Sequence, residues 1–277
     1  MKENARAMLL CAALSLAALP LFGAAPAAAE EATGQAETGA WADIRANLYD
    51  AALLLADGIV AIEAPARAED AALVPMTVRT TLDPADPRRV TEITLIIDEN
   101  PSPVAATFTL GEGADVSAIS TRVRVNAYTP VHAVAKLSDG SLHVAETFVK
   151  ASGGCAAPMA RDPDEALANL GRMKLRWFPS AETPKMSHSL AQLMIRHPNN
   201  SGLQFDQISR LYIPAHFVTD LSIRQGDDLI LRMEGGISIS EDPSFRFDFA
   251  SNGEPIRVEA TDTEGESFVS EWQPNAS

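Results

Sequence analysis

Short runs of alternating hydrophobic and polar residues dominate the chain and predict mostly β-structure. In the first half these runs lie at residues 59–63, 76–80, 90–98, 105–110, 121–126, 131–138 and 141–149. In the second half, apolar residues alternate at 173–177, 221–223, 229–233, 245–249 and 256–258. Turn-forming pairs such as Asn-Gly and Asp-Pro separate the runs, which is typical of antiparallel sandwiches. We therefore expect an all-β fold with two strand-rich regions.

Two segments have a helical pattern instead. Apolar residues recur at helical spacing near the start of the first region, at Trp41, Ile44, Leu48, Ala52 and Leu55, and predict an amphipathic helix that covers this region. Between the regions, Asp162-Pro163-Asp164-Glu165 combines an Asp N-cap with Pro and Glu at positions that favour a helix start, and Gly171 follows. We expect this second helix to form an ordered linker.

A hairpin is predicted at the end of the first region. Asp139-Gly140 is typical of a two-residue type I′ turn, which would place Lys136 opposite His143 and His132 opposite Thr147. The two histidines would then lie roughly 14 Å apart along the ribbon. That separation is too large for joint metal coordination.

The first 29 residues resemble an export signal. Lys2 and Arg6 precede an apolar run, and Ala27-Ala28-Ala29 provides a small-residue cleavage site. We expect residues 1–29 to be removed and residues 30–40, rich in Ala, Gly, Thr and Glu, to form a disordered lead-in. Cys11 would be lost with the signal, although a lipid anchor at Cys11 is an alternative. No later run approaches the roughly 20 apolar residues that span a bilayer, so no membrane insertion is expected after cleavage.

Composition excludes several classes of function. The chain carries a formal net charge of -15 and has no basic stripe, which argues against nucleic acid as a partner. It has no zinc-binding pattern, P-loop, Rossmann fingerprint or GxSxG motif, so we expect neither a metal site nor a cofactor, and no catalytic constellation. His197 and His216 are interpreted as hydrogen-bonded residues of the second region.

Cys155 is the candidate chemical group. It is the one cysteine left after loss of Cys11, so it has no intrachain disulfide partner. Ser152, Gly153 and Gly154 precede it and predict a flexible arm, because glycine tolerates backbone conformations that other residues avoid. From Lys150, such a tether would reach on the order of 16 to 18 Å. We expect an exposed, nucleophilic thiol on a mobile loop.

Several motifs resemble a known family pair. Residues 63–77 (EAPARAEDAALVPMT) and the closing segment KASGGC at 150–155 resemble SoxY, the thiosulfate-carrying subunit of the Sox system. The second region resembles SoxZ in the segments RHP at 196–198, SGL at 201–203, IPAHF at 213–217, Asp242-Pro243 and Trp272. The resemblance covers residues 41–158 and 172–275, so the chain is similar to a fused SoxYZ carrier.

This resemblance implies a fold and a function. In that family the subunits are immunoglobulin-like β-sandwiches that pair, which implies a SoxY-like domain at 41–158, a helical linker at 159–171 and a SoxZ-like domain at 172–277. It also implies a periplasmic protein that holds sulfur intermediates covalently on Cys155. Its partners would be Sox-type enzymes, or the quinoprotein (PQQ) alcohol dehydrogenases and cytochrome c enzymes with which fused members are associated.

One departure from the SoxY pattern leaves the function open. The SoxY cysteine lies at the extreme C-terminus, whereas Ala156-Ala157-Pro158 follow Cys155 here and the chain continues. A loop enters a partner's tunnel as two lengths of chain, so the partner would need a wider opening or would act on a more superficial sulfur. The carried group can therefore differ from thiosulfate. Two alternatives remain: a noncovalent docking module for a quinoprotein dehydrogenase, and a redox enzyme that lacks the usual resolving cysteine.

Overall fold

A computed structural model describes residues 39–49, 54–83, 85–160, 162–178 and 188–273. The predicted signal peptide at 1–29 and nearly all of the predicted lead-in lie outside these residues. Of the lead-in, Ala40 already belongs to a helix. Neither helix of the described segments has the length and hydrophobicity needed to cross a membrane.

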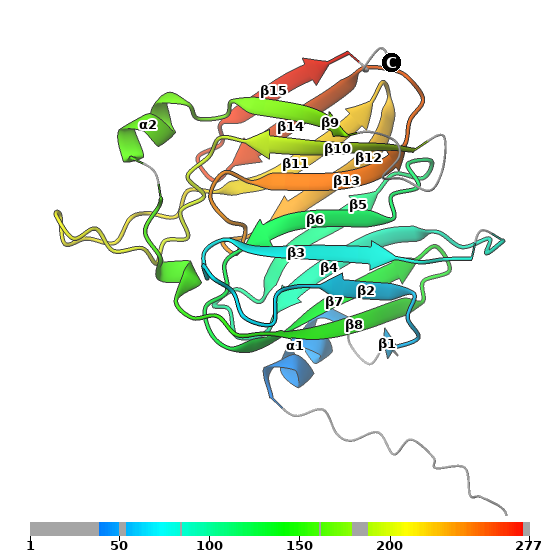
Figure 1. The fold of residues 1–277 in the computed structure, drawn as a ribbon, viewed down its shortest axis with the longest axis horizontal. Helices are drawn as coiled ribbons and strands as arrows, with labels where there is room; N and C mark the ends of the chain where they lie inside the picture. Colours follow the sequence, from blue (N-terminus) through cyan, green and yellow to red (C-terminus); the bar gives the residue numbers. More distant parts are fainter. Residues whose placement is uncertain (1–38, 50–53, 84, 161, 179–187, 274–277) are drawn as a thin grey trace, which may run out of the picture. The chain divides into compact units, whose positions relative to one another are not determined.

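The described chain is mostly β-structure with two α-helices and one 3-10 turn, as Figure 1 shows. The first half contains α1 (Ala40–Tyr49), β1 (Leu54–Leu55), β2 (Val60–Glu63), β3 (Val74–Thr80), β4 (Val90–Ile97), β5 (Val104–Leu110), β6 (Ala118–Val123), β7 (Thr129–Leu137) and β8 (Leu142–Val149). The 3-10 turn η1 (Gly154–Ala156) and α2 (Pro163–Ala168) follow. The second half contains β9 (Met173–Phe178), β10 (His188–Ile195), β11 (Val218–Gln225), β12 (Asp228–Gly235), β13 (Ser244–Ala250), β14 (Ile256–Asp262) and β15 (Ser267–Trp272).

Both sheets run continuously through the two halves. One has nine strands in the order β1-β8-β7-β4-β5-β12-β11-β14-β15, and the other has six in the order β2-β3-β6-β13-β10-β9. The halves meet where β5 pairs with β12 and where β6 pairs with β13, both antiparallel. The predicted all-β, immunoglobulin-like fold is confirmed, and both sheets pass from one half to the other (Figure 1). The halves share backbone hydrogen bonds and one hydrophobic core.

The alternating pattern of the sequence accounts for the core. Inward-facing residues of both sheets form one buried hydrophobic cluster that extends across the halves. Within it, Phe108 of β5 and Phe245 of β13 pack edge to face with ring centroids 6.2 Å apart. Burial of such apolar surface is the main stabilising contribution, and here it links strands that are far apart in the sequence.

The first helix is shorter than predicted. Its described part is Ala40–Tyr49, and Ala52 of the predicted run lies outside the described residues. Leu54–Leu55 form a strand parallel to β8, so Leu55 belongs to the sheet. Trp41 lies flat on His132 of β7, with ring centroids 3.7 Å apart. Helical spacing alone could not exclude a strand at the end of this run, because two adjacent leucines also suit a half-buried sheet edge.

The register of the β7–β8 hairpin also differs from the prediction. Lys136 pairs with Leu142 and His132 with Glu146, so every pair is shifted by one residue. The reason is a three-residue loop, in which the Leu137 amide donates to Ser141 O and Gly140 has a φ of 86°. The linker helix is as expected, because Asp162 accepts hydrogen bonds from the amides of Asp164 and Glu165.

Candidate functional site: a buried cysteine turn between the two halves

The predicted exposure of Cys155 is wrong. Cys155 lies in the single turn η1, where its relative exposure is 0%, and it is a free cysteine. Its neighbours Ser152, Gly153 and Ala156 are exposed. The turn therefore runs along the surface with its thiol directed into the protein.

The glycine pair allows the turn to adopt this conformation and to pack closely against the protein. Gly153 has a φ of 78°, a left-handed conformation that favours glycine. A Cβ on Gly154 would lie 2.0 Å from Ala71 O and 2.7 Å from Val125 O, so only a residue without a side chain fits there. The amides of Gly153 and Gly154 donate to the carbonyls of Asn126 and Val125. The pair that predicts a mobile arm thus also permits close docking.

Residues of the second half also contact the turn. We call the residues that hold it its seat: Arg124, Val125, Asn126 and Ser201. The Ser201 hydroxyl donates to Cys155 O and also lies 3.1 Å from the Gln204 side-chain oxygen. Arg124, next to the end of β6, donates from Nη1 to Gly154 O at 3.2 Å and from Nη2 to Asn199 O at 3.3 Å. The cysteine turn is therefore held by both halves at once.

The docked conformation disfavours the reactive form of the thiol. Burial raises the pKa of Cys155, and the charge of Arg124 opposes this shift with a smaller effect. Because the thiolate is the nucleophile in sulfur chemistry, the docked turn protects the sulfur. In this conformation Cys155 has no exposed surface that a reactant could reach.

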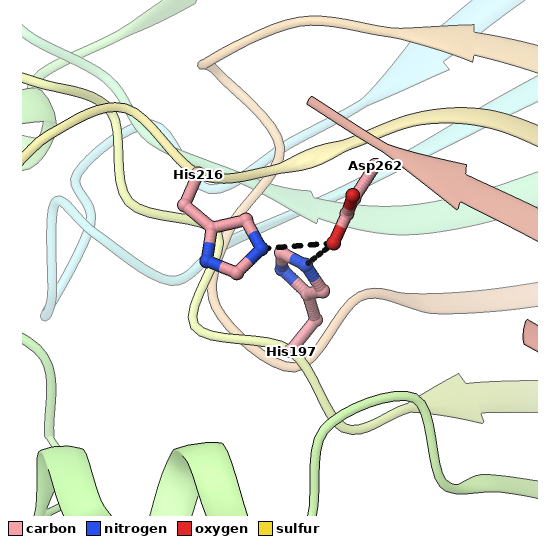
Figure 2. A group of neighbouring side chains, drawn as sticks. All are labelled: His197, His216 and Asp262. Carbon is pink, nitrogen blue, oxygen red and sulfur yellow. Dashed lines mark hydrogen bonds and ion pairs between the residues drawn. The ribbon is translucent and has the colours of Figure 1, made fainter. Parts of the chain in front are cut away.

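A second cluster lies in the second half of the chain, where Asp262 joins His197 and His216. Nε2 of His216 lies 2.8 Å from Oδ2 of Asp262, and Nε2 of His197 lies 3.3 Å from the same oxygen, as Figure 2 shows. Asp262 Oδ1 accepts hydrogen bonds from the amides of Glu264 and Glu266. The interpretation of both histidines as hydrogen-bonded residues is confirmed.

These three side chains are close enough to bind a metal ion, since their ligand atoms lie within 4.8 Å of one another. The hydrogen bonds argue against that use. Nδ1 of His197 accepts from the Asn199 amide, so the proton of the neutral ring is on Nε2 and points to Asp262. A histidine that binds metal through one nitrogen normally donates from the other. The cluster fits a His-Asp-His hydrogen-bond network better than a metal centre.

Sequence reasoning missed Arg124 and Ser201. Arg122 and Arg124 alternate with valines in one predicted strand. That pattern predicts the same exposed position for both arginines and does not show that Arg124 is buried. The distinction arises because β6 ends at Val123 and the Arg124 amide donates to Ser238 O of the second half. Ser201 lies within a segment that carries the SoxZ resemblance, but its contact with Cys155 depends on how the halves meet.

Comparison with known proteins gives matches for both halves. Residues 45–155 match the family model of the sulfur oxidation protein SoxY, and residues 180–273 match that of the sulphur oxidation protein SoxZ. No curated protein matches the chain. The SoxY match ends at Cys155.

Solved structures include a relative of the first half. The sulfur carrier protein SoxY from Chlorobium limicola f thiosulfatophilum is 27% identical, and the match covers 40% of this chain and 94% of that chain with a TM-score of 0.32. A superoxide reductase (neelaredoxin) from Ignicoccus hospitalis is 14% identical, over 33% of this chain and 77% of that chain, with a TM-score of 0.30. A β-glucuronidase from Parabacteroides merdae is 7% identical, over 78% of this chain and 25% of that chain, with a TM-score of 0.25.

Proposed function

We propose that this chain, which is a SoxYZ-like fusion of a SoxY domain with a SoxZ domain, carries sulfur intermediates covalently on Cys155. The observation that carries the proposal is the end of the SoxY match at residue 155. This residue is the one free cysteine of the described segments. A thiolate is also the group that forms reversible persulfide or disulfide-type adducts.

Burial of the thiol is compatible with a carrier that alternates between docked and released states. The turn is flanked by exposed residues, and a small set of hydrogen bonds to Arg124, Val125, Asn126 and Ser201 holds it. Local openings of this size occur in folded proteins without global unfolding. We propose that the docked state shields the adduct, and that the released state presents it to a partner.

The proposed location and partners follow from the sequence. Residues 1–29 would direct export to the periplasm and be removed there. The loading and unloading enzymes would be Sox-type proteins, or the quinoprotein dehydrogenase and cytochrome c enzymes named by the resemblance. The fusion itself would not be an enzyme, because the adduct is made and removed by others.

We propose that partners contact the hairpin of residues 205–212, which lies close in sequence to Ser201 of the seat. Phe205 and Tyr212 pair across it with ring centroids 5.6 Å apart, and at its tip Ile208 is 95% exposed and Leu211 is 67% exposed. Its base holds Ser201, which contacts Cys155. A partner that binds this apolar tip would approach the site where the adduct is released.

Intact-mass analysis of the protein isolated from its own cells tests the carrier function. We expect a sulfur-containing adduct that maps to Cys155 and is absent from a Cys155→Ser variant, because serine cannot form the S–S bond. Cells grown with and without reduced sulfur compounds provide the comparison. A bare thiol under all growth conditions would rule the carrier out.

The buried thiol favours one alternative, a noncovalent docking module for a quinoprotein dehydrogenase. In that case Cys155 would act as a small core residue, and Cys155→Ser would leave the growth phenotype of the cells unchanged. A carrier loses all function with the same substitution. Growth of cells that express the variant therefore separates the two functions.

A further inference from the structure

Arg124 is a buried cation that contacts no counter-ion among the described residues. Its relative exposure is 1%, and among the fully buried side chains of the described residues it is the largest by volume. Across the described residues, no carboxylate lies within ion-pair distance of its guanidinium, whose hydrogen bonds go to the carbonyls of Gly154 and Asn199. Its buried Nε has no hydrogen-bond partner in the described part of the chain.

Such an arrangement is energetically costly. An arginine stays protonated in proteins, and a buried charge without a paired opposite charge is strongly destabilising. Glu241 and Asp70 act on Arg124 through their charge, but among the described residues neither is hydrogen-bonded or ion-paired with it. The Cys155 thiol lies one residue beyond Gly154 and is neutral when docked. The seat of the turn therefore lacks one negative charge.

We propose that Arg124 is the charge partner of an anionic adduct on Cys155, so that an arm loaded with an anion docks more stably than an arm loaded with a neutral or cationic group. The inference rests on the proposed carrier function and adds to it the residue that holds the loaded arm in place. Arg124 is a positioning residue in this role, because it holds the loaded arm and takes no part in a bond-forming step.

Two reagents of similar size and opposite charge provide the probe. The Cys155 thiolate attacks the sulfenyl sulfur of a methanethiosulfonate, the S–S bond of the reagent breaks, and methanesulfinate leaves with the electron pair. One reagent leaves a sulfonatoethyl disulfide on Cys155 and the other leaves a trimethylammonioethyl disulfide. Long incubation allows the turn to open, and intact mass confirms loading of the full chain.

We expect the anionic adduct to melt about 2 to 4 °C above the cationic adduct, a shift typical of one added polar interaction in a domain of this size. The whole-chain charge of -15 attracts cations, so a preference for the anion must come from the local site. Arg124→Gln should abolish the preference, and Arg124→Lys, which keeps the charge, should retain part of it.

Equal melting temperatures for the two wild-type adducts would overturn the inference. A preference for the anion that persists in Arg124→Gln would overturn it as well, since the charge would then come from elsewhere. If Arg124→Gln does not fold, the melting temperatures of the two wild-type adducts and of the two Arg124→Lys adducts still test the inference. An adduct found in native cells would leave the carrier function standing in either case, whereas a wild-type thiol that resists all loading would count against both.

Discussion

At the scale of single residues, Ser201 is the contact that links the cysteine turn to the second half. Its hydroxyl donates to Cys155 O, and loss of this donor would leave a buried carbonyl without that partner. Such a loss costs on the order of 1 to 3 kcal/mol, and here the cost would fall on the docked state.

Replacement of Ser201 should therefore expose the thiol. In Ser201→Ala we expect Cys155 to react with a thiol reagent about tenfold faster than in the wild type, because about 1.4 kcal/mol changes an equilibrium tenfold. The rate of labelling by intact mass measures the effect. Ser209→Ala is the control, because the Ser209 hydroxyl contacts Asp206 at the exposed hairpin tip. Equal rates in both variants would contradict the role of Ser201.

His197 predicts a pH dependence of stability. Burial lowers the pKa of His197, although a hydrogen bond to Asp262 partly opposes the shift. As pH falls below the ordinary histidine value of about 6.5, the unfolded chain therefore takes up a proton before the folded protein does. The stability that neutral His197 contributes is complete above that pH and is lost as pH falls toward the lower, folded-state pKa.

Urea unfolding at a series of pH values measures this dependence. We expect the wild-type midpoint to decrease as pH is lowered from 8 to 5.5, and the decrease to be smaller in His197→Gln. The variant should also be less stable at pH 8, since it loses the hydrogen bonds to Asn199 and Asp262. An identical pH profile in both proteins would show that another group controls the titration.

At the scale of elements, the turn η1 depends on the two glycines for different reasons. A Cβ on Gly154 would overlap backbone atoms of Ala71 and Val125. A Cβ on Gly153 would meet no atom of the described residues within 4 Å, so its strain would come from its φ of 78°. The first substitution blocks the seat itself. The second adds a backbone penalty of about 1 to 2 kcal/mol.

The two alanine variants should therefore differ in thiol accessibility. We expect Gly154→Ala to undock the turn and to raise the labelling rate of Cys155 well above that of Gly153→Ala, with little loss of global stability because the sheets do not depend on the turn. Labelling rates and melting temperatures of both variants provide the measurement. Faster labelling in Gly153→Ala than in Gly154→Ala would contradict the described seat.

The same turn shows where sequence reasoning succeeds and where it fails. Alternation of apolar residues predicted most strands, and the capping residues of Asp162-Pro163 predicted α2, because these signals are local. The pattern identified Cys155 and its glycines as the candidate site, but flexibility in an isolated peptide says nothing about a docking surface supplied by distant residues. Arg124, Asn199 and Ser201 provide that surface, and their approach depends on the tertiary fold.

At the scale of the whole molecule, the pairing of β5 with β12 and of β6 with β13 joins the two halves into shared sheets. Separated halves would each expose strand edges, which attract other chains. The seat of the cysteine turn also requires both halves. We therefore expect the described sandwich to unfold as one cooperative unit.

A core substitution in the second half tests this cooperativity. Phe247 is fully buried in β13 and pairs with Ile119 of β6, so Phe247→Ala should cost about 3 to 5 kcal/mol through the cavity it leaves. In a background with Trp177→Phe and Trp272→Phe, Trp41 is the one remaining tryptophan, so its fluorescence reports on the first half. We expect the urea midpoint measured by Trp41 fluorescence to fall together with that measured by circular dichroism.

The control for this experiment is Phe205→Ala, because Phe205 is 43% exposed on the protruding hairpin. Its removal should change the midpoint little, since the sheets do not depend on that contact. Should Phe247→Ala lower the dichroism midpoint while the Trp41 signal keeps the wild-type value, the halves would unfold separately. The cysteine turn would then be anchored to a partner domain that can leave it, and release of the thiol would follow from opening of the halves rather than from local movement of the turn.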